Sequence, residues 1–326
     1  MSPQGSSSVS VSVVLPTYNR LRYLRDAIGS VFAQTFTDWE LVIADDGSEE
    51  ETCHYLSRLA GDPRLQILFL PHTGNPAAAR NLALRRARGH YVAFLDSDDV
   101  WLPEKLARQV AALRADAAAR WNYCAVRRIG ADGAVMEADT KRVFVAHCGA
   151  IFRQILTLEA SIATPAVLAE RALIEQAGAF DEQQPHFEDY DLWLRLIRLS
   201  DVGVVAEPLV CVRSHDQHYT ADRIAVYQAR SRLLDKHRPF AQGASLRRAW
   251  AGERARNDIC LARAYARAGR RTQALRTLWR GRREILRTRA GIWQPAGETV
   301  LLALSPPWLR ALARQLRRHR GAMLAG

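Results

Sequence analysis

The sequence has few cysteines and no long apolar run, and these two shortages exclude several classes of protein. Its 326 residues include only five cysteines, an odd number, and no two of them have a C-x-x-C spacing. This distribution argues against a disulfide framework and a thiolate zinc site, and it favours a reducing compartment. No apolar run approaches the roughly 18–20 residues of a membrane-spanning helix. Residues 1–8 are polar, without a signal-peptide pattern, so we expect a disordered N-terminus and a cytoplasmic protein.

Acidic residues are scarce at one end of the chain only. Residues 221–326 hold 24 Lys and Arg against 6 Asp and Glu, a net charge of +18, whereas residues 1–220 hold 22 against 28, a net charge of −6. The excess of +12 for the whole chain therefore comes from its last third. Such asymmetry predicts two regions with different partners.

Apolar and amphipathic segments alternate along the first hundred residues. The apolar segments predict strands and the amphipathic ones helices, at intervals suited to βαβ units and a mainly parallel sheet. The predicted strands are residues 9–15, 40–44, 65–70 and 90–95, and the predicted helices are residues 20–34, 49–60 and 75–87. Farther on, residues 121–129 and 134–145 predict a hairpin. Residues beyond 221 predict helices, with a turn at Gly269.

Three of the predicted strands end in polar loops. The loops contain Pro16-Thr17-Tyr18-Asn19, Asp45-Asp46 and Asp96-Ser97-Asp98-Asp99. In parallel sheets, ligands bind outside the carboxyl ends of the strands. We therefore expect these three loops to face one crevice.

The third loop has three carboxylates within four residues. Their mutual repulsion is relieved by solvent or by a cation. Mg2+ or Mn2+ is bound by one or two carboxylates together with ligand phosphates, and would stabilise a diphosphate leaving group. The alternative is a polar turn with an Asp helix cap ahead of Pro103. This stretch alone supports both interpretations equally.

Three other polar sites are ambiguous when taken singly. Asp45 and Asp46 could accept hydrogen bonds from a ribose or a base, or could simply form a turn. Arg80 follows three alanines in a predicted helix and could reach a phosphate, although a solvated arginine is more common. Glu188 and Asp189 lie at a predicted helix N-terminus, which favours negative charge, and a carboxylate there could also act as a general base.

Taken together, these segments resemble family 2 glycosyltransferases in order and spacing across residues 9–216. The resemblance rests on residues 13–20 (VVLPTYNR), Asp45-Asp46-Gly47-Ser48, Ala79-Arg80-Asn81, residues 94–99 (FLDSDD) and residues 188–195 (EDYDLWLR). It implies an α/β protein with a GT-A fold in residues 9–221, followed by a basic helical region in residues 222–326. It also implies transfer of a sugar from a nucleotide diphosphate to a hydroxyl acceptor, with inversion at the anomeric carbon.

The resemblance also assigns roles to residues. Asp189 matches the general base, with Glu188 beside it. Asp98 matches the direct metal ligand, and Asp96 is placed nearer the ribose or as a second ligand. His215, in an Arg-x-His element, matches a residue that returns to the diphosphate or metal in some relatives. The residues assigned to the nucleotide are Pro16, Thr17, Asn19, Asp45, Asp46, Arg80 and Asp96.

The partners implied are a nucleotide-sugar donor, with a UDP-sugar preferred, Mn2+ or Mg2+, and a glycan or lipid-linked acceptor. The Gln-x-x-Arg-Trp element of processive polymer synthases is missing, so a single addition in bacterial cell-surface polysaccharide or glycolipid assembly is favoured. The nearest rival enzyme passes the sugar to a polyprenyl phosphate. The alternative that is not an enzyme is a nucleotide-sugar-binding or membrane-adaptor protein derived from a transferase that has lost its activity.

The basic end lies outside the resemblance. Residues 308–318 place Leu309, Leu312 and Leu316 on one helical face with arginines beside it, as in an interfacial amphipathic helix. Peripheral contact with the inner face of the cytoplasmic membrane and packing on the catalytic domain are equally weighted interpretations. Nucleic acid is not expected, because the charge lies outside any recognisable nucleic-acid module.

Overall fold

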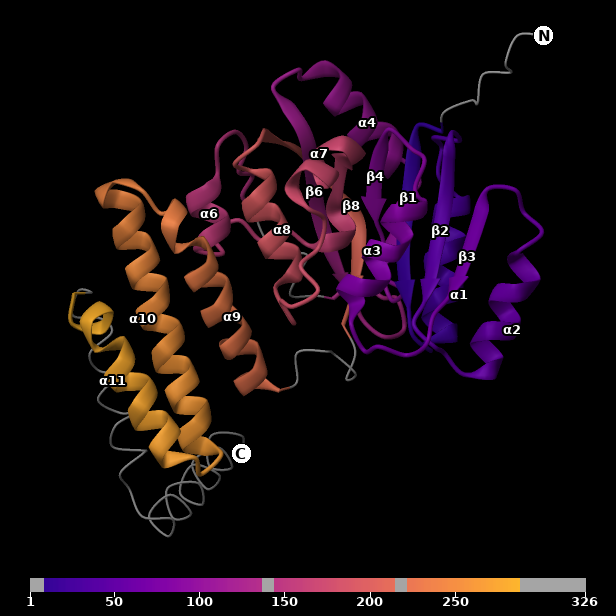
Figure 1. Cartoon of the computed structure of the whole chain (residues 1–326). Coiled ribbons are helices and arrows are strands. Elements are labelled where there is room, and N and C mark those ends of the chain that lie inside the picture. Colours follow the sequence, from indigo (N-terminus) through magenta and orange to yellow (C-terminus); the bar gives the residue numbers. More distant parts are fainter. Residues whose placement is uncertain (1–8, 137–143, 215–221, 288–326) are drawn as a thin grey trace, which may run out of the picture. The chain divides into compact units, whose positions relative to one another are not determined.

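The computed structural model of the chain describes residues 9–136, 144–214 and 222–287. The chain divides into two compact units, Met1–His218 and Tyr219–Gly326. The first contains a sheet with helices, and the second contains helices in its described part (Figure 1).

The sheet of the first unit has eight strands in the order β3-β2-β1-β4-β7-β6-β8-β5. Strands β3, β2, β1 and β4 run parallel to one another, so the first half of the unit is built from βαβ units, as predicted. Strands β7 and β5 run antiparallel to their neighbours, whereas β6 and β8 are parallel. The strands are β1 (Val11–Thr17), β2 (Trp39–Asp45), β3 (Leu65–Phe69), β4 (Tyr91–Phe94), β5 (Val100–Trp101), β6 (Ala119–Ile129), β7 (Val167–Glu170) and β8 (Asp201–Arg213).

Helices pack on the strands of the sheet through apolar side chains. Helix α3 packs on β1 and β2, and α4 packs on β6 and β8 (Figure 1). Strands β1 and β2 are buried along their whole length, as their continuous apolar sequence predicts. The helices of this unit are α1 (Leu21–Phe32), α2 (Glu50–Leu59), α3 (Pro76–Arg86), α4 (Lys105–Ala115), α6 (Phe152–Leu156), the 3₁₀ turn η1 (Thr164–Ala166), α7 (Arg171–Ala177) and α8 (Glu188–Leu196).

One expectation for this unit was wrong. Strand β1 does not end before Pro16 but continues through Thr17, because Pro16 and Thr17 keep their parallel register with Ala44 and Asp45 of β2. The predicted hairpin is described only at its turn, where an antiparallel bridge joins Ile129 to Val135 and Met136 donates its N–H to the carbonyl of Arg128. Residues 137–143 of its second arm lie outside the described residues, and β6 also pairs with β7 and β8.

The second unit contains α9 (Arg223–His237), the 3₁₀ turn η2 (Arg238–Phe240), α10 (Gly243–Arg267) and α11 (Arg271–Arg287). Helices α10 and α11 form a helical hairpin, and Gly269 takes a φ of 79° at its turn, as predicted. Their apolar core includes Ile259, Ala262 and Leu278. No helix in the described ranges is both long and apolar enough to cross a membrane.

Candidate active site

The carboxyl ends of β1, β2 and β4 meet at one edge of the sheet. Thr17 pairs in register with Asp45, and Val14 pairs with Phe94, two residues before Asp96. The three polar loops of the sequence therefore leave the same edge, as predicted. Pro16 and Thr17 are buried within β1 itself.

The loop after β1 is held in an unusual backbone conformation. Asn19 and Arg20 both have left-handed φ values, of 55° and 60°. Asn19 donates its backbone N–H to the hydroxyl of Ser48 at 2.6 Å, and its side-chain oxygen accepts the N–H of Glu49 at 2.8 Å. Each left-handed non-glycine residue costs on the order of 1 kcal/mol, so these bonds fix a strained turn against the loop after β2.

The two aspartates after β2 are both engaged in loop formation. Asp45 accepts the backbone N–H of Ser48 at 3.0 Å, together with its hydroxyl. Asp46 accepts the N–H and the hydroxyl of Thr73, at 2.9 and 2.7 Å, and the N–H of Gly74 at 2.8 Å. These bonds give both residues a structural role. A contact of either residue with a nucleotide stays a prediction.

An aromatic pair lies at the mouth of these loops. The rings of Tyr18 and His72 stack with centroids 4.0 Å apart and planes inclined by 20°. His72 is anchored because its Nδ1 lies 2.8 Å from the carbonyl oxygen of Asp46. Tyr18 is 44% exposed, so one face of the pair is accessible to a planar ligand.

Arg80 is the buried hub of the site. Its side chain is 7% exposed, and its Nη1 and Nη2 donate to Glu188 at 2.9 Å and to Asp96 at 2.7 Å. Both carboxylates raise the pKa of the guanidinium further above its usual value, against the opposing effect of burial. Helix α3 thus joins the loop after β4 to the start of α8. A direct contact of Arg80 with a diphosphate stays a prediction.

The acidic loop after β4 is crowded with negative charge. Burial raises the pKa of Asp96 and, more strongly, that of Asp99, and the neighbouring carboxylates raise both further. Asp99 accepts the backbone N–H of Arg213 at 2.8 Å. Arg20 contacts one carboxylate oxygen of Asp98 at 2.6 Å. The loop therefore holds three neighbouring carboxylates whose mutual repulsion a cation would relieve.

The three carboxylates at the start of α8 each make a different contact. Asp191 is fully buried and pairs with Arg195 at 2.7 Å, so it is structural. Glu188 binds Arg80. Asp189 accepts the hydroxyl of Thr164 at 3.0 Å, and burial together with the charge of Glu188 raises its pKa to about 7.

The backbone ahead of this helix is strained as well. His186 and Phe187 have φ values of 55° and 56°, so the residues just before Glu188 are left-handed. A second pair of consecutive left-handed residues thus borders the site. Such conformations persist only where the surrounding structure fixes them, and they gather at functional sites.

The donor set of the acidic loop suits a hard divalent cation. Asp96 and Asp98 offer carboxylate oxygens, and Mg2+ in particular is often held by one or two carboxylates plus substrate phosphates. Within the described ranges, no cluster of three or more His, Cys, Asp or Glu could hold a metal by itself. His215, the third predicted ligand, lies outside the described residues. The residues present therefore fit a cation that is shared with a phosphate ligand.

Sequence reasoning missed four residues of this site. Thr164 lies in an unpatterned segment, and only the fold brings it to Asp189. His72 and Thr73 follow β3, whose end had no acidic signal. Arg20 was part of the quoted segment, but its pairing with Asp98 spans 78 residues and is invisible in the sequence.

Residues 12–155 match the family model described as Glycosyl transferase family 2. An uncharacterized glycosyltransferase of Rickettsia felis is 32% identical over 213 residues, which are 65% of this chain and 34% of the relative. The chain thus spans about a third of that relative's length. A protein of Escherichia coli, UDP-Glc:alpha-D-GlcNAc-diphosphoundecaprenol beta-1,3-glucosyltransferase WfgD, is 29% identical over 62% of this chain and 75% of its own.

The fold also has counterparts among solved structures. The mannosyltransferase PcManGT of Pyrobaculum calidifontis, in complex with GDP-Man and Mn2+, superimposes with a TM-score of 0.59 at 20% identity. The match covers 90% of this chain and 85% of that chain. At this identity the likeness concerns the fold alone, which is the GT-A fold that the resemblance implies.

Proposed function

From the match of residues 12–155 to the family 2 glycosyltransferases, we propose that this chain transfers a sugar from a nucleotide diphosphate to a hydroxyl acceptor with inversion. The observation that carries the proposal is the Asp189–Glu188–Arg80–Asp96 arrangement. A carboxylate whose pKa is about 7 lies at one end, and the acidic loop at the other. A direct displacement needs a base on one side and charge neutralisation on the other.

Asp189 is the proposed general base. The acceptor oxygen bonds to the anomeric carbon, its proton passes to Asp189, and the bond from that carbon to the diphosphate oxygen breaks. A base is most effective when its pKa lies near the working pH, and the raised pKa of Asp189 meets this condition. The hydrogen bond from Thr164 orients the carboxylate.

Asp98 and Asp96 are the proposed ligands of Mn2+ or Mg2+. The cation, when bound, neutralises the charge of the departing diphosphate. Arg80 holds Asp96 in place through its 2.7 Å contact. Arg20 does the same for Asp98, so both carboxylates are oriented before the donor arrives.

The donor is proposed to be a UDP-sugar. The E. coli relative is named for UDP-glucose. Tyr18 and His72 form a stacked surface beside the loops after β1 and β2, and a pyrimidine base could pack on its exposed face. Asn19 and Asp46 lie in the same loops as the aromatic pair, which supports a nucleotide site there.

The acceptor is proposed to occupy a cavity of about 790 Å³ beside β6 and β8. Its lining includes Ala163, the neighbour of the Thr164 that contacts Asp189. Phe144 and Pro208 supply apolar surface, and Arg127 supplies positive charge. A mixed apolar and cationic lining suits a glycan carried on a lipid phosphate, the kind of acceptor for which the E. coli relative is named.

The test is a transfer and hydrolysis assay with a panel of UDP-, GDP- and dTDP-sugars, each measured with Mn2+ and with EDTA. Turnover of one donor that disappears in EDTA would support a metal-dependent transferase. Donor binding without turnover, with lipid-linked acceptors included, would favour the adaptor protein instead. Thermal-shift screening with the same panel identifies the base and sugar independently of the acceptor.

A further inference from the structure

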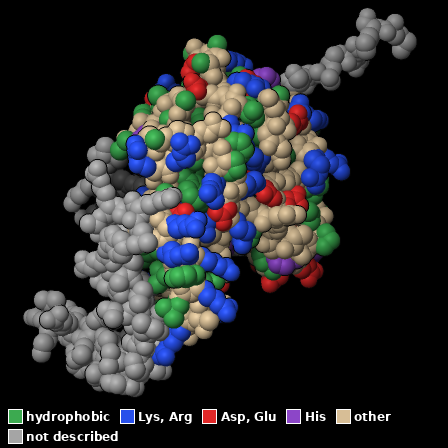
Figure 2. Space-filling view, turned by 60° about the vertical axis from the view of Figure 1, so that its left-hand side comes forward, with side chains coloured by type: hydrophobic (Ala, Val, Ile, Leu, Met, Phe, Trp, Pro, Cys, Tyr) green, Lys and Arg blue, Asp and Glu red, His purple; other side chains and the backbone are tan. Residues whose placement is uncertain are grey.

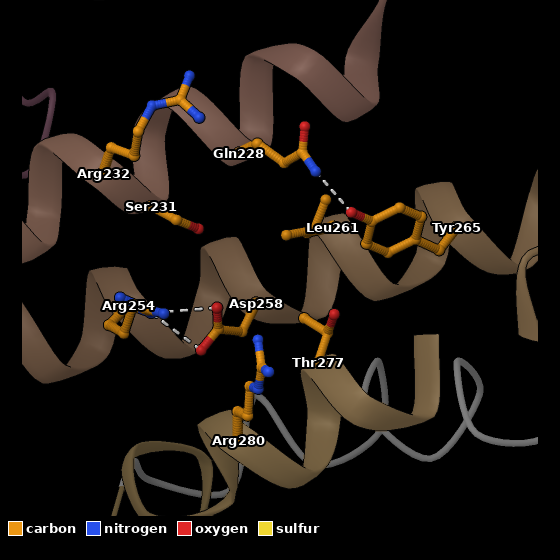
Figure 3. A pocket seen from close by; sticks show the side chains of 9 residues that line it. All are labelled: Gln228, Ser231, Arg232, Arg254, Asp258, Leu261, Tyr265, Thr277 and Arg280. Carbon is orange, nitrogen blue, oxygen red and sulfur yellow. Dashed lines mark hydrogen bonds and ion pairs between the residues drawn. The ribbon is translucent and has the colours of Figure 1, made fainter. Parts of the chain in front are cut away.

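A polar cavity of about 300 Å³ opens among the three long helices of the second unit (Figure 3). It lies entirely within α9, α10 and α11, outside the family match. Its volume is at the lower end of the range for small-ligand sites. The side chains around it come from all three helices, so their positions depend on how the helices pack.

The lining of this cavity contains three arginines. One comes from each helix, Arg232 from α9, Arg254 from α10 and Arg280 from α11, and the carboxylate among the described lining residues is Asp258 of α10. Asp235 also pairs with Arg254, and Glu284 lies close enough to raise the pKa of Asp258, so the positive charge open to a ligand is that of Arg232 and Arg280. A phosphate or diphosphate group would neutralise this charge.

The arginines differ in what they already bind. Arg254 donates to both oxygens of Asp258 at 3.1 Å and also pairs with Asp235. The ion pairs described within residues 222–287 do not include Arg232 or Arg280, and both side chains are exposed. Among the described residues, two of the three guanidinium groups therefore have no carboxylate partner.

The hydroxyl of Tyr265 also lines this cavity. Tyr265 accepts a hydrogen bond from the side chain of Gln228 at 2.7 Å, so the proton of its hydroxyl remains to be donated (Figure 3). Phosphate oxygens accept hydrogen bonds from arginine and hydroxyl groups alike. The cavity thus offers donors of both kinds from separate helices.

Gly281 explains how α11 comes close enough to contribute. A Cβ at this position would overlap the carboxylate of Asp258, so any larger residue would displace either that carboxylate or α11. Glycine inside a helix costs roughly 0.5–1 kcal/mol relative to alanine. The close approach brings Arg280 and Thr277 to the cavity.

Basic side chains are also abundant outside the cavity. Figure 2 shows a face of the molecule on which Lys and Arg side chains are more abundant than Asp and Glu. Arg276 and Arg283 of α11 are exposed but do not line the cavity. General attraction of anions to α11 can therefore be measured separately from binding in the cavity.

We propose that this cavity is a phosphate-binding site, which takes the phosphate or diphosphate group of a lipid headgroup or of a soluble phosphate. The inference does not depend on the transferase activity. Arg232 and Arg280 bind the anion from two helices, and the hydroxyl of Tyr265 donates a hydrogen bond to it. The ion pair with Asp258 holds Arg254 in position.

The test uses the full chain in EDTA, which suppresses cation-dependent binding of diphosphates at the acidic loop. Inorganic pyrophosphate is titrated by calorimetry against the parent, Arg232→Gln and Arg280→Gln. Each loss of a charge-assisted bond should weaken binding by roughly tenfold or more. Both arginines are exposed, so these variants should keep their fold, and circular dichroism checks this. Arg276→Gln is the matched control on α11 and should leave the affinity unchanged.

A second arm distinguishes the sources. The same variants are bound to phosphatidylcholine vesicles with and without phosphatidic acid. Loss of both pyrophosphate and vesicle binding indicates a site open to either source, and loss of vesicle binding alone assigns it to a lipid headgroup. Equal binding of both probes by the parent and the two cavity variants would overturn the proposal. So would an equal loss in Arg276→Gln, because the attraction would then be a property of the whole helix surface.

Discussion

The buried arginines of the first unit differ from the two exposed arginines that line the cavity of the second. In the first unit, Arg80 and Arg213 are almost completely buried, and each contacts carboxylates that belong to other elements. In the second unit, Arg232 and Arg280 are exposed on helices with few acidic neighbours. The difference shows how one residue type serves two purposes. Buried and paired, it fixes the geometry of a site. Exposed and in excess, it offers charge to a ligand.

The largest effect should come from the proposed base of the first unit. Asp189→Asn should lower kcat/KM for transfer by roughly 10²–10⁴-fold, the usual contribution of general-base catalysis. Donor affinity should change far less than the transfer rate, because the residue contacts Thr164 rather than the nucleotide loops. Steady-state kinetics and donor titration measure the two quantities.

Glu188→Gln is the companion variant. Full activity of Asp189→Asn combined with a slow Glu188→Gln enzyme would move the base by one residue. Two fully active variants would remove the start of α8 from the mechanism.

The next effect concerns the paired arginine. Arg80→Ala leaves Asp96 and Glu188 without their shared cation, and breaking such a buried pair should lower the free energy of unfolding by about 3–5 kcal/mol. Urea denaturation measures it. Arg153→Ala is the control, because the Arg153–Glu159 pair is half exposed and should contribute less than about 1 kcal/mol. Equal losses would contradict the distinction between buried and exposed arginines.

Removal of one proposed carboxylate ligand of the cation should weaken donor binding. Asp98→Asn should weaken donor binding in Mn2+ by roughly tenfold or more, because one proposed ligand of the cation is neutralised. In EDTA the variant and the parent should bind the donor equally. A donor affinity that is the same for both proteins in Mn2+ would exclude Asp98 as a ligand.

The pH dependence should follow from the raised pKa of Asp189. Below pH 7 the carboxylate takes up a proton, so log kcat/KM should fall by about one for each pH unit. The pH dependence of the free energy of unfolding has the opposite sign. Because the folded protein holds this proton more tightly than the unfolded chain, the contribution of Asp189 is greatest below about pH 4 and is lost as the pH rises through 7. Asp189→Asn should abolish the acidic limb of its residual rate profile.

The smallest effect concerns the basic end, whose predicted amphipathic helix at residues 308–318 lies outside the described residues. Truncation at about Pro306 should leave donor hydrolysis intact and reduce binding to anionic vesicles, more so at low salt. Vesicle sedimentation at two salt concentrations measures it. Equal binding by the truncated and full-length proteins would favour a helix that packs on the protein.

The first half of the chain was easily predicted because its signals are local. Strands β2, β3 and β4 lie within a residue or so of their expected bounds, since continuous apolar runs between polar loops identify buried parallel strands. The carboxylates Asp96, Asp98 and Asp189 were named because acidic residues at a strand end and at a helix start are conspicuous. The pairing of β6 with β8 was not predicted, because it joins segments about eighty residues apart and the pattern of β6 equally suits a hairpin.

The contacts within the site could not be predicted from the sequence, for a related reason. Arg80 was predicted to reach a phosphate, but nothing local indicates that it contacts both Asp96 and Glu188. The stacking of Tyr18 on His72 likewise depends on how two loops meet. A sequence identifies candidate residues, whereas their distances depend on the packing of several elements.

The single guanidinium of Arg80, shared by the two ends of the proposed site, would couple those ends thermodynamically. A cation that neutralised Asp96 would leave more of the charge of Arg80 to Glu188, the neighbour of the proposed base. Occupancy at the donor end would then alter the proton affinity of Asp189. Because such coupling is reciprocal, ionisation of Asp189 would change the affinity for the cation and its donor by the same factor.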